Sequence, residues 1–483
     1  MASKVISTST DIGIQGNAAW MLGHLYLSAC AVTETRASVP PNYSYLKETS
    51  VLRSLVDFLL EAGKHGPEKV KNGELKVVLN SLQDEVSRLL PPLNWAGVLS
   101  PLMRMEYDNE IKCLCIKLAI TQCISSPTAA SFISSWLQPT LFSSLTDDCR
   151  IELFKSLPLM LKPVQFSVLK IFLSKCCMIP FSTTPVQSSH CVAVLEGLNK
   201  ALLVHDPPKS VTLMLYETTE NLYKAVTDCS DVQVLTNLSK CLFSIPDDRF
   251  DTMTADDFTD PKTFIKGVFI RCQLVAMGRQ PIVILNSCLD ATINNKTCDY
   301  KKVFSILCHC FYSTVMSSTE STGAMYLVQW LLELVGHVRN ISIGVIQLDD
   351  NALPLATVLE LLIGVVSAAI SIWTMPSVAC MINIDTKLLI SDVDSETKTS
   401  QVPTVDILQC LQSLPVSIVN LKVEPWLQIL PKIVNWMVSI LELSDDLLSP
   451  HARKSLKDCL YLLRDSEEFK KAAVWTQVFT LDQ

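Results

Sequence analysis

Apolar positions along the chain recur at steps of three and four residues, the spacing of one face of an α-helix. Residues 73–92, GELKVVLNSLQDEVSRLLPP, keep this spacing until two prolines end the helix. Residues 50–63, SVLRSLVDFLLEAG, begin at a capping Ser50 and stop at Gly63. The pattern therefore predicts one helix over each of these segments.

Helix start signals recur in the same way. A capping serine followed by proline at the first helical position is a typical start, and it occurs at Ser126 and at Ser449. Asp108 is placed to cap NEIKCLCIKLAITQC. Prolines open two further helical patterns, at Pro163 and at Pro261, and Gly278 closes the second.

The whole chain is predicted to be built from helix pairs. We expect about 18–20 helices, with two helices in every ~40–47 residues, which is the period of HEAT and armadillo arrays. No strict consensus repeats, and alternating strand patterns are scarce. The predicted fold class is therefore all-α, an irregular α-solenoid of HEAT/armadillo-like antiparallel helix pairs with no significant β-sheet.

Two polar segments divide the array. Residues 244–261, SIPDDRFDTMTADDFTDP, carry six aspartates and are expected to form a solvated surface loop. Residues 391–402 are expected to form a flexible polar loop. The resulting organisation is a partly helical N-terminal segment 1–40, helical-repeat regions 41–245 and 246–390, the loop 391–402, and C-terminal helical repeats 403–483.

Composition adds that the helices should be buried on more than one side, because 49% of the residues are hydrophobic and only 18% are charged. The formal net charge is −8, and the basic residues are scattered. A basic cluster is the usual footprint of a nucleic-acid-binding surface. Direct nucleic-acid binding is therefore not expected.

One apolar stretch is long enough to span a bilayer. Residues 361–384, LLIGVVSAAISIWTMPSVACMINI, contain 24 residues without a charge. The helix is expected to begin near Leu353 or Pro354, to include Glu360, and to end or kink at Pro376. The lack of flanking basic residues favours a buried helix of a soluble core, with Glu360 solvated or paired. The alternative is a transmembrane helix near 354–384.

The sequence has 18 cysteines and no secretory signal at its start, so we expect reduced, buried thiols in the cytosol. Cys113 with Cys115, and Cys308-His309-Cys310, resemble metal ligands. Both groups lie in helical patterns, where residues two apart point in different directions, and neither has matching zinc-site halves. No metal and no cofactor are therefore expected.

Catalytic signatures are missing as well: the sequence has no nucleophile elbow, no phosphate loop and no dinucleotide fingerprint. A non-enzymatic protein without a small-molecule substrate is expected. What remains is surface for protein partners, where tryptophan and arginine are typical anchors. The tentative interface residues are Trp330, Arg339, Asn340, Trp426 and Trp475.

Several stretches together resemble the focadhesin family, in the C-terminal region of its much longer chains. The matching pieces, in the same order, are ASVPPNYSYLKETSVLRSLVDFLLEAGKHGPE, NWAGVLSPLMR, WLLELVGHVRN and EFKKAAVWT. The resemblance implies a HEAT-like scaffold without enzymatic activity. It also implies links to focal adhesions, to growth suppression, and to maintenance of the cytosolic superkiller complex of mRNA decay.

The expected function is therefore a scaffold or adaptor that presents a helical-repeat surface to proteins. By resemblance, its partners would be focal-adhesion components or superkiller-complex subunits, and its location the cytoplasm, including focal adhesions. The alternative is a membrane-embedded adhesion component that uses the apolar helix near 354–384 as its span.

Overall fold

The computed structural model describes the backbone of residues 1–35, 48–104, 106–182, 188–227, 229–317, 329–331, 333–334, 336–337, 340–341, 348, 350–374, 407–419, 430–443 and 445–465. Within these ranges the chain is helical, with no strand. The predicted all-α fold is confirmed. The described residues hold 23 α-helices, more than predicted, because some helices have only four or five residues. The predicted loop at 391–402 lies outside the described ranges.

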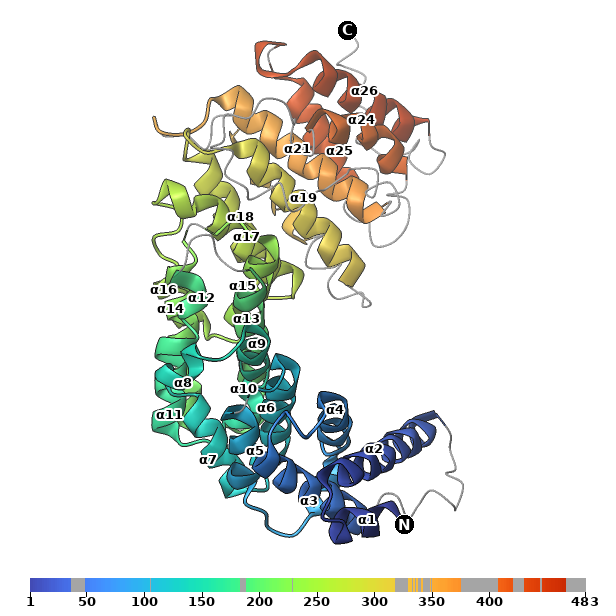
Figure 1. The fold of residues 1–483 in the computed structure, drawn as a ribbon. Helices are drawn as coiled ribbons and strands as arrows, with labels where there is room; N and C mark the ends of the chain where they lie inside the picture. The colour runs from blue at the N-terminus through green and yellow to red at the C-terminus, as the bar shows by residue number, and fades with distance from the viewer. Residues whose placement is uncertain are drawn as a thin grey trace. The chain divides into compact units, whose positions relative to one another are not determined.

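The chain divides into two units, Met1–Val226 and Thr227–Gln483. This division falls ahead of the boundary predicted at 245. Figure 1 shows the helices of each unit in chain order.

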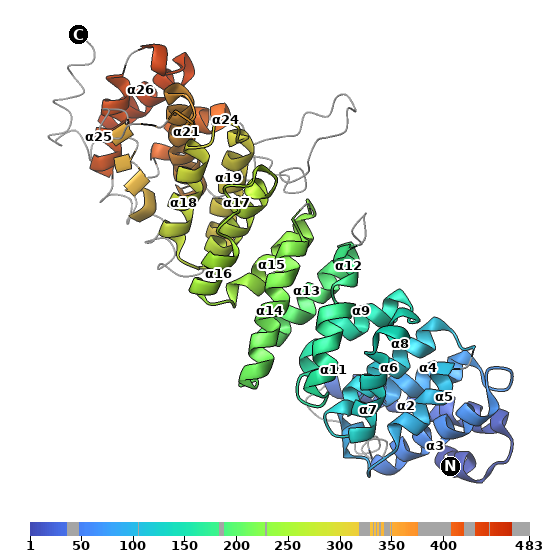
Figure 2. The same cartoon turned by 90° about the vertical axis from the view of Figure 1, so that its left-hand side faces the viewer.

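Unit 1 consists of two rows of helices, in which each helix packs on the next member of its row. Helices of one row also pack on those of the other, so the unit is a stack of helix pairs (Figures 1 and 2). The first row is α2 (Ile12–Thr35), α4 (Asn72–Ser81), α6 (Asn109–Cys123), α9 (Asp147–Lys155) and α13 (Ser188–Leu202). The second is α1 (Ala2–Thr8), α3 (Thr49–His65), α5 (Trp95–Arg104), α7 (Pro127–Trp136) and α8 (Pro139–Ser143).

Shorter elements lie between the members of these rows. They are the 3₁₀ helix η2 (Glu85–Leu89), α10 (Leu157–Met160), α11 (Phe166–Ile171), the π-helix η3 (Phe172–Cys176) and α12 (Ile179–Ser182). Unit 1 ends with the long helix α14 (Lys209–Ala225). The helix predicted to open at Pro163 therefore begins only at Phe166 and changes to a π-helix after one and a half turns.

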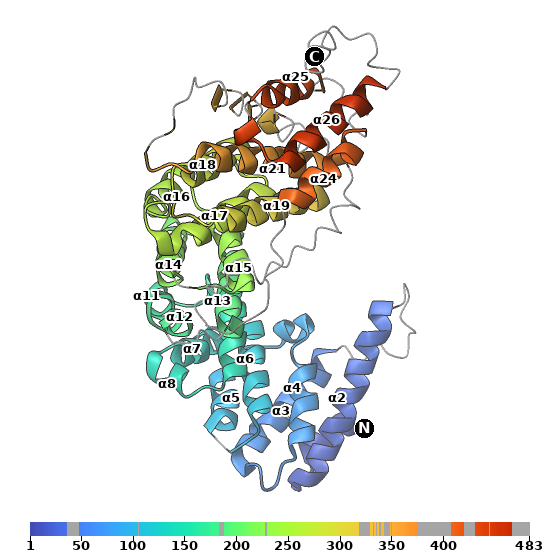
Figure 3. The same cartoon turned by 90° about the horizontal axis from the view of Figure 1, so that it is seen from above.

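Unit 2 has one continuous row, in which each helix again packs on the next (Figure 3). Its members are α15 (Val232–Phe243), α17 (Pro261–Ala276), α19 (Tyr300–Ser317), α21 (Leu355–Thr374), α24 (Ile407–Ile418) and α26 (Pro450–Arg464). Beside this row lie α16 (Asp247–Met253), α18 (Pro281–Ile293), α25 (Leu430–Leu441) and η6 (Asp445–Leu447).

Several predicted helix starts are confirmed. The Ser126 and Ser449 hydroxyls accept hydrogen bonds from the backbone N–H groups of α7 and α26, each with proline at the first helical turn. Helix α6 has the predicted bounds, and Asp108 stands at its N-cap position, but the Asp108 side chain makes no capping hydrogen bond. Pro261 opens α17, and Gly278 follows its end with a φ of 96°.

Two predicted helices have different bounds. Helix α3 begins before Ser50 and continues past Gly63 to His65, where Gly66 ends it with a φ of 77°. The segment 73–92 is not one helix, because α4 ends at Ser81 and η2 follows. The break comes at Asp84, whose carboxylate accepts hydrogen bonds from Val86 N–H and from the Tyr26 hydroxyl at 2.9 Å. The apolar spacing predicts one continuous helix, but the contact of Asp84 with the distant Tyr26 accompanies a break in it.

The acidic segment 244–261 is also not a plain surface loop. It contains helix α16, with Asp247 and Asp248 in the first turn, where carboxylates oppose the positive end of the helix dipole. The side chain of Asp257 is buried rather than solvated. The prediction failed because it treated the aspartates as a group, although one of them pairs with an arginine further along the chain.

The apolar helix α21 is buried nearly all round, as predicted: every residue from 361 to 372 is buried. It has the length and composition of a membrane span, and is the only helix of the described ranges that does. Glu360 is exposed, as expected for the helix of a soluble core, and lines a surface pocket of about 230 Å³. The helix ends at Thr374, just ahead of Pro376.

Candidate functional site

A surface groove in unit 2 lies between α16, the end of α17 and the start of α18. We name it the α16–α18 groove; its volume is about 260 Å³. Apolar and charged side chains share its lining: Phe250, Phe258, Val283 and Ile284 with Asp247, Asp251, Arg271 and Arg279. Val283 is 65% exposed, so the groove presents an apolar contact to solvent.

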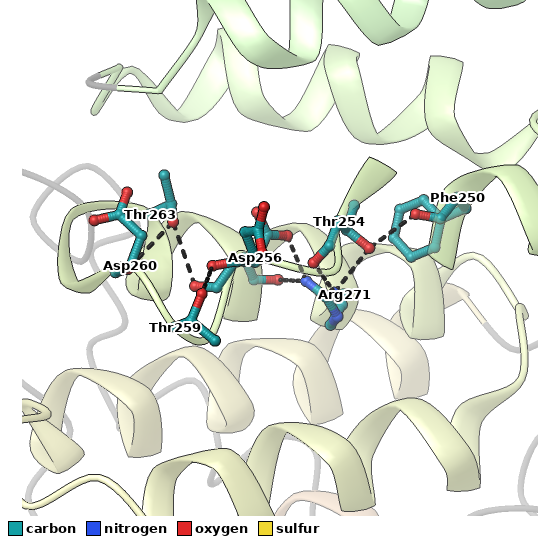
Figure 4. A network of polar contacts seen from close by, with 9 residues as sticks. Phe250, Thr254, Asp256, Thr259, Asp260, Thr263 and Arg271 are labelled. Carbon is teal, nitrogen blue, oxygen red and sulfur yellow. Dashed lines mark hydrogen bonds and ion pairs between the residues drawn. The ribbon is translucent and has the colours of Figure 1, made fainter. Parts of the chain in front are cut away.

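The floor of the α16–α18 groove is a buried polar network centred on Arg271 (Figure 4). One guanidinium nitrogen, Nη1, donates to the Asp257 carboxylate at 2.7 Å, and the other, Nη2, donates to the Thr254 hydroxyl at 2.9 Å. The guanidinium also lies over the rings of Phe258 and Phe250, with distances of 4.4 and 5.6 Å to their centroids. The charge of Arg271 is therefore compensated from several sides.

The sequence builds this floor locally. Asp260 caps α17 by accepting a hydrogen bond from Lys262 N–H at 3.2 Å. Arg271 lies further along the same helix, and its side chain reaches back to the turn that precedes α17. Gly267 lies one helical turn before Arg271. A Cβ atom there would approach the Asp257 Cβ to 2.8 Å, so glycine permits the close contact.

A second arginine fixes the wall of the groove. The Arg279 side chain donates from Nε to Asp247 Oδ1 and from Nη1 to the Leu242 carbonyl, both at 2.8 Å. Gln280, just before α18, donates to the second oxygen of Asp247 and adopts a φ of 36°. A non-glycine residue in this left-handed region is uncommon. The side-chain bond to Asp247 links the start of α18 to α16.

The rim of the groove is acidic on its α16 side. Asp251 lines the groove, and Asp248 and Asp256 are exposed on α16 or the turn after it, whereas the exposed Asp247 pairs with Arg279. Arg271 and Arg279 already bind carboxylates, so their charges are offset within the protein. The groove therefore offers an apolar surface with exposed carboxylates on its α16 side. It suits an apolar side chain flanked by Lys or Arg.

The residues predicted as interface anchors lie outside this groove. Trp330 is fully buried, donates from Nε1 to Asn286 Oδ1 at 2.8 Å, and packs on the Phe311 ring. Asn340 is exposed. Arg339, Trp426 and Trp475 lie outside the described residues. The interface role of these five residues stays a prediction.

Beside Trp330 the structure brings together polar residues that the sequence analysis did not single out. They line a second pocket of about 220 Å³: Asn286, Asp290, Glu333 and His337. His337 Nε2 lies 3.6 Å from the Asp290 carboxylate, and Asn286 donates to Glu333 at 3.4 Å. No sequence pattern predicts that these residues lie together, because α18 and the segment around 333–337 are far apart in the sequence and meet only in the folded chain.

The cysteines considered as metal ligands point to different neighbours. Cys310 donates to the Cys272 carbonyl at 3.1 Å, whereas the Cys308 thiol faces Cys410. Burial raises the pKa of the Cys308 thiol well above its usual value. The described residues contain no cluster of three His, Cys, Asp or Glu side chains placed to hold a metal ion.

The sequence analysis did not identify the residues of the α16–α18 groove. Arg271 was part of an apolar helical pattern, and Asp257 was one aspartate among six. The only available signal was a single arginine within the apolar stretch FIKGVFIRCQLVA, because an arginine on a buried face requires a partner.

Comparisons with known proteins bear on the whole chain. A structural comparison matches a Kap121p mutant crystal structure with a TM-score of 0.45 and 11% identity, over 99% of this chain and 52% of the other. Human focadhesin is 31% identical over 99% of this chain and 27% of its own length. The mouse and zebrafish focadhesins are each 30% identical with the same coverage.

The chain thus spans about a quarter of the length of these curated relatives. The focadhesin family model itself matches residues 1–481. The match covers both units and nearly every residue of the sequence, and so the chain belongs to the focadhesin family.

Proposed function

We propose that this chain is a non-enzymatic helical-repeat scaffold, and that the α16–α18 groove docks a segment of a partner protein. The segment would place an apolar side chain against Val283 and Phe258, and would carry Lys or Arg beside it. The observation that carries the proposal is an apolar groove whose own arginines are already paired, with exposed carboxylates on its α16 side.

Charge complementarity supports a basic segment. A lysine or arginine beside the bound apolar residue would pair with Asp251, and the exposed Asp248 and Asp256 add negative charge on the same helix and the turn after it. Such pairs at a rim mainly raise the association rate and the specificity, whereas the buried apolar contact slows dissociation. The floor is held by buried hydrogen bonds, so little ordering is required on binding.

Membership of the focadhesin family suggests the class of partner. We place focal-adhesion components and subunits of the superkiller complex first among the candidates, and the cytoplasm, including focal adhesions, as the location. The wider family roles, growth suppression and maintenance of the superkiller complex, are proposals here as well. Direct nucleic-acid binding is not part of the proposal, because the groove is acidic.

The test is affinity capture with matched variants, read by quantitative mass spectrometry. Val283→Arg places a bulky cation in the groove, and Val416→Arg makes the same change on α24 at a side chain of similar exposure, 61%. Docking in the groove predicts partners that are retained by the wild type and by Val416→Arg but lost with Val283→Arg.

A charge reversal in the rim tests the basic residue of the docked segment separately from its apolar contact. Asp251→Lys is expected to weaken binding and to reduce its salt dependence, whereas Asp458→Lys, an exposed aspartate on α26, leaves both unchanged. Partners that bind all four variants equally would contradict docking in the groove. Recovery of neither adhesion nor RNA-decay proteins would remove the support for the family-based partners.

A second candidate function is a membrane-embedded adhesion component, favoured by the length and apolar composition of α21. Its burial against α19 and α24 and the exposed Glu360 speak against a span. Carbonate extraction distinguishes the two: a protein that stays in the membrane pellet supports the span, and release into the soluble fraction excludes it.

A further inference from the structure

The pocket beside Trp330 in unit 2 has no permanent cation to offset its carboxylates. We name it the α18 pocket; its volume is about 220 Å³. The residues that line it come from α18 and from the segment around 333–337: Asn286, Leu289, Asp290, Glu333, Leu334 and His337. Asp290 and Glu333 are exposed, and none of these lining residues is a lysine or an arginine. The lining of the α16–α18 groove, in contrast, includes two arginines that already pair with carboxylates. The α18 pocket therefore keeps an uncompensated negative charge.

The α18 pocket also has an apolar part that can receive methylene groups. Leu289 and Leu334 line it although they are only 3% and 2% exposed. Lysine and arginine side chains pack their methylene groups on apolar surface and keep the charged head at a polar one. A guanidinium can in addition bind two carboxylates, because its N–H groups form a planar fork. Since one water occupies only ~30 Å³, the pocket has room for such a side chain. Its lining therefore suits an arginine.

Neutral groups orient the two carboxylates of the α18 pocket. Trp330 donates from Nε1 to Asn286 Oδ1 at 2.8 Å, and the amide nitrogen of Asn286 donates to Glu333 at 3.4 Å. His337 Nε2 lies 3.6 Å from the Asp290 carboxylate, and its imidazole is charged only when it is protonated. The amide orients Glu333 without cancelling its charge. Groups that are oriented before binding lose less freedom when a ligand arrives, so less of the binding free energy is spent on ordering them.

The α18 pocket and the α16–α18 groove lie along the same exposed face of α18. The exposed residues of this helix include Val283, Ser287 and Asp290, at steps of four and three, which form one helix face. Val283 and Ser287 line the groove, and Asp290 lines the pocket. Val283 and Asp290 are two helical turns apart, a distance of about 10 Å along the helix. An extended chain covers this distance in about three residues, so one segment can reach both sites.

We propose that the α18 pocket binds an arginine side chain of the same partner segment whose apolar residue docks in the α16–α18 groove. The proposal rests on docking in that groove and adds a second basic residue to the one that pairs with Asp251. It also defines the segment: an apolar residue against Val283 and an arginine between Asp290 and Glu333, about three residues apart along the segment. Two contacts at a fixed spacing restrict which segments can bind.

The decisive measurement uses NMR of the intact chain, isotope-labelled in its tryptophan indoles. The indole N–H of Trp330 reports on the pocket, because Asn286 connects it to Glu333. The variant Trp330→Phe identifies its signal among those of the eight tryptophans. The probe is Nα-acetyl-arginine amide, which should shift the Trp330 signal and saturate in the millimolar range. Nα-acetyl-citrulline amide has the same shape but a neutral urea in place of the guanidinium, and should cause no shift.

Matched variants and a lysine probe test the assigned chemistry. Asp290→Asn removes one of the two carboxylates and should weaken binding of the arginine probe by about five- to ten-fold. The control Asp458→Asn, at an exposed aspartate on α26, should leave the affinity unchanged. Nα-acetyl-lysine amide should bind several-fold less tightly than the arginine probe. A Trp330 signal that does not respond to arginine, or that responds equally to lysine or citrulline, would overturn the proposal.

Short peptides test whether the pocket and the groove take one segment. The acetylated peptide amides Leu-Gly-Ser-Arg and Arg-Ser-Gly-Leu carry the two contacts in either chain direction. One of them should bind about ten-fold more tightly than the arginine probe, because the second contact is then intramolecular. Val283→Ser removes the apolar contact and should abolish this gain, while the affinity for the arginine probe stays the same. A gain in neither direction contradicts the assignment of both contacts to one segment.

Docking in the groove is judged by a different result. If Val283→Arg loses the captured partners but the Trp330 signal does not respond to arginine, docking in the groove is supported and the arginine site is wrong. If the Trp330 signal responds but Val283→Arg retains every partner, docking in the groove fails, and the proposal of one segment in both sites fails with it.

Discussion

Arg271 and Asp257 form an ion pair of 2.7 Å, and their side chains are only 10% and 5% exposed. The pair joins α17 to the turn that precedes it and forms the floor of the α16–α18 groove. A buried charge without its partner is strongly unfavourable, because neither water nor a counter-ion replaces the lost interaction. The stability of unit 2 should therefore depend on both members being present.

Replacement of Arg271 by methionine should destabilise unit 2 by about 3–5 kcal/mol, because it leaves the Asp257 carboxylate buried and unpaired. The matched control is Arg53→Met on α3, where Arg53 pairs with Asp57 at 3.2 Å but both side chains are more than 40% exposed. That change should cost less than ~1 kcal/mol. Urea denaturation measures the loss in the free energy of unfolding for both variants. Equal losses would show that the buried pair contributes no more to stability than the exposed one.

Gly197 on α13 should not tolerate a side chain. A Cβ atom at this position would lie 1.9 Å from the Phe154 carbonyl oxygen on α9, a backbone atom that cannot move without shifting the helix. Gly197→Ala should therefore destabilise unit 1 by at least ~1–3 kcal/mol, although alanine favours a helix. Gly73→Ala on α4, where nothing lies within 4 Å, should be neutral or stabilising. Thermal unfolding of the two variants provides the comparison.

His309 should make unit 2 sensitive to acid. Burial lowers the pKa of its imidazole, which stacks on the Phe269 ring, below the usual value of about 6.5. The unfolded chain then binds the proton more readily than the folded one. This contribution to stability is fully present above pH ~6.5 and is lost as the pH falls through the lowered pKa.

His309→Gln removes this titration, so the drop in the free energy of unfolding between pH 7 and pH 5 should be smaller in the variant than in the wild type. Other groups titrate equally in both proteins and cancel in the comparison. An identical pH dependence would mean that the imidazole is protonated as easily in the folded state as in the unfolded one.

Glu360 and Leu362, two residues apart on α21, should respond very differently to substitution. Glu360 is exposed, so Glu360→Gln should change the free energy of unfolding by less than ~0.5 kcal/mol. Leu362 is fully buried, so Leu362→Ala should cost about 2–5 kcal/mol in aqueous solution without detergent. A wild-type protein that stays folded only in detergent or lipid would contradict this soluble-core interpretation.

The sequence predicts those parts of the fold that are governed by local signals. The starts of α7, α17 and α26 follow from their own caps and prolines, and the bounds of α6 follow from its apolar spacing. The burial of α21 also follows from its composition.

Features that depend on distant partners were not predictable in this way. The helix ends at Ser81 because Asp84 is held by Tyr26, 58 residues earlier, and Asp257 is buried because Arg271 lies opposite it. The same holds for the candidate site. Its charged floor and wall depend on ion pairs between residues that are distant in the sequence. The tryptophan anchors were instead predicted from residue type alone, and one of them, Trp330, is fully buried.

The two rows of unit 1 also have a kinetic consequence. Each helix packs mainly on helices no more than four places away along the chain, so native contacts form by closing short loops. Chains with such low contact order fold quickly, and in helical arrays folding can begin at one pair and spread to the next. We therefore expect unit 1 to fold during synthesis. Each helix pair can complete its packing soon after it leaves the ribosome, before the rest of the chain has been made.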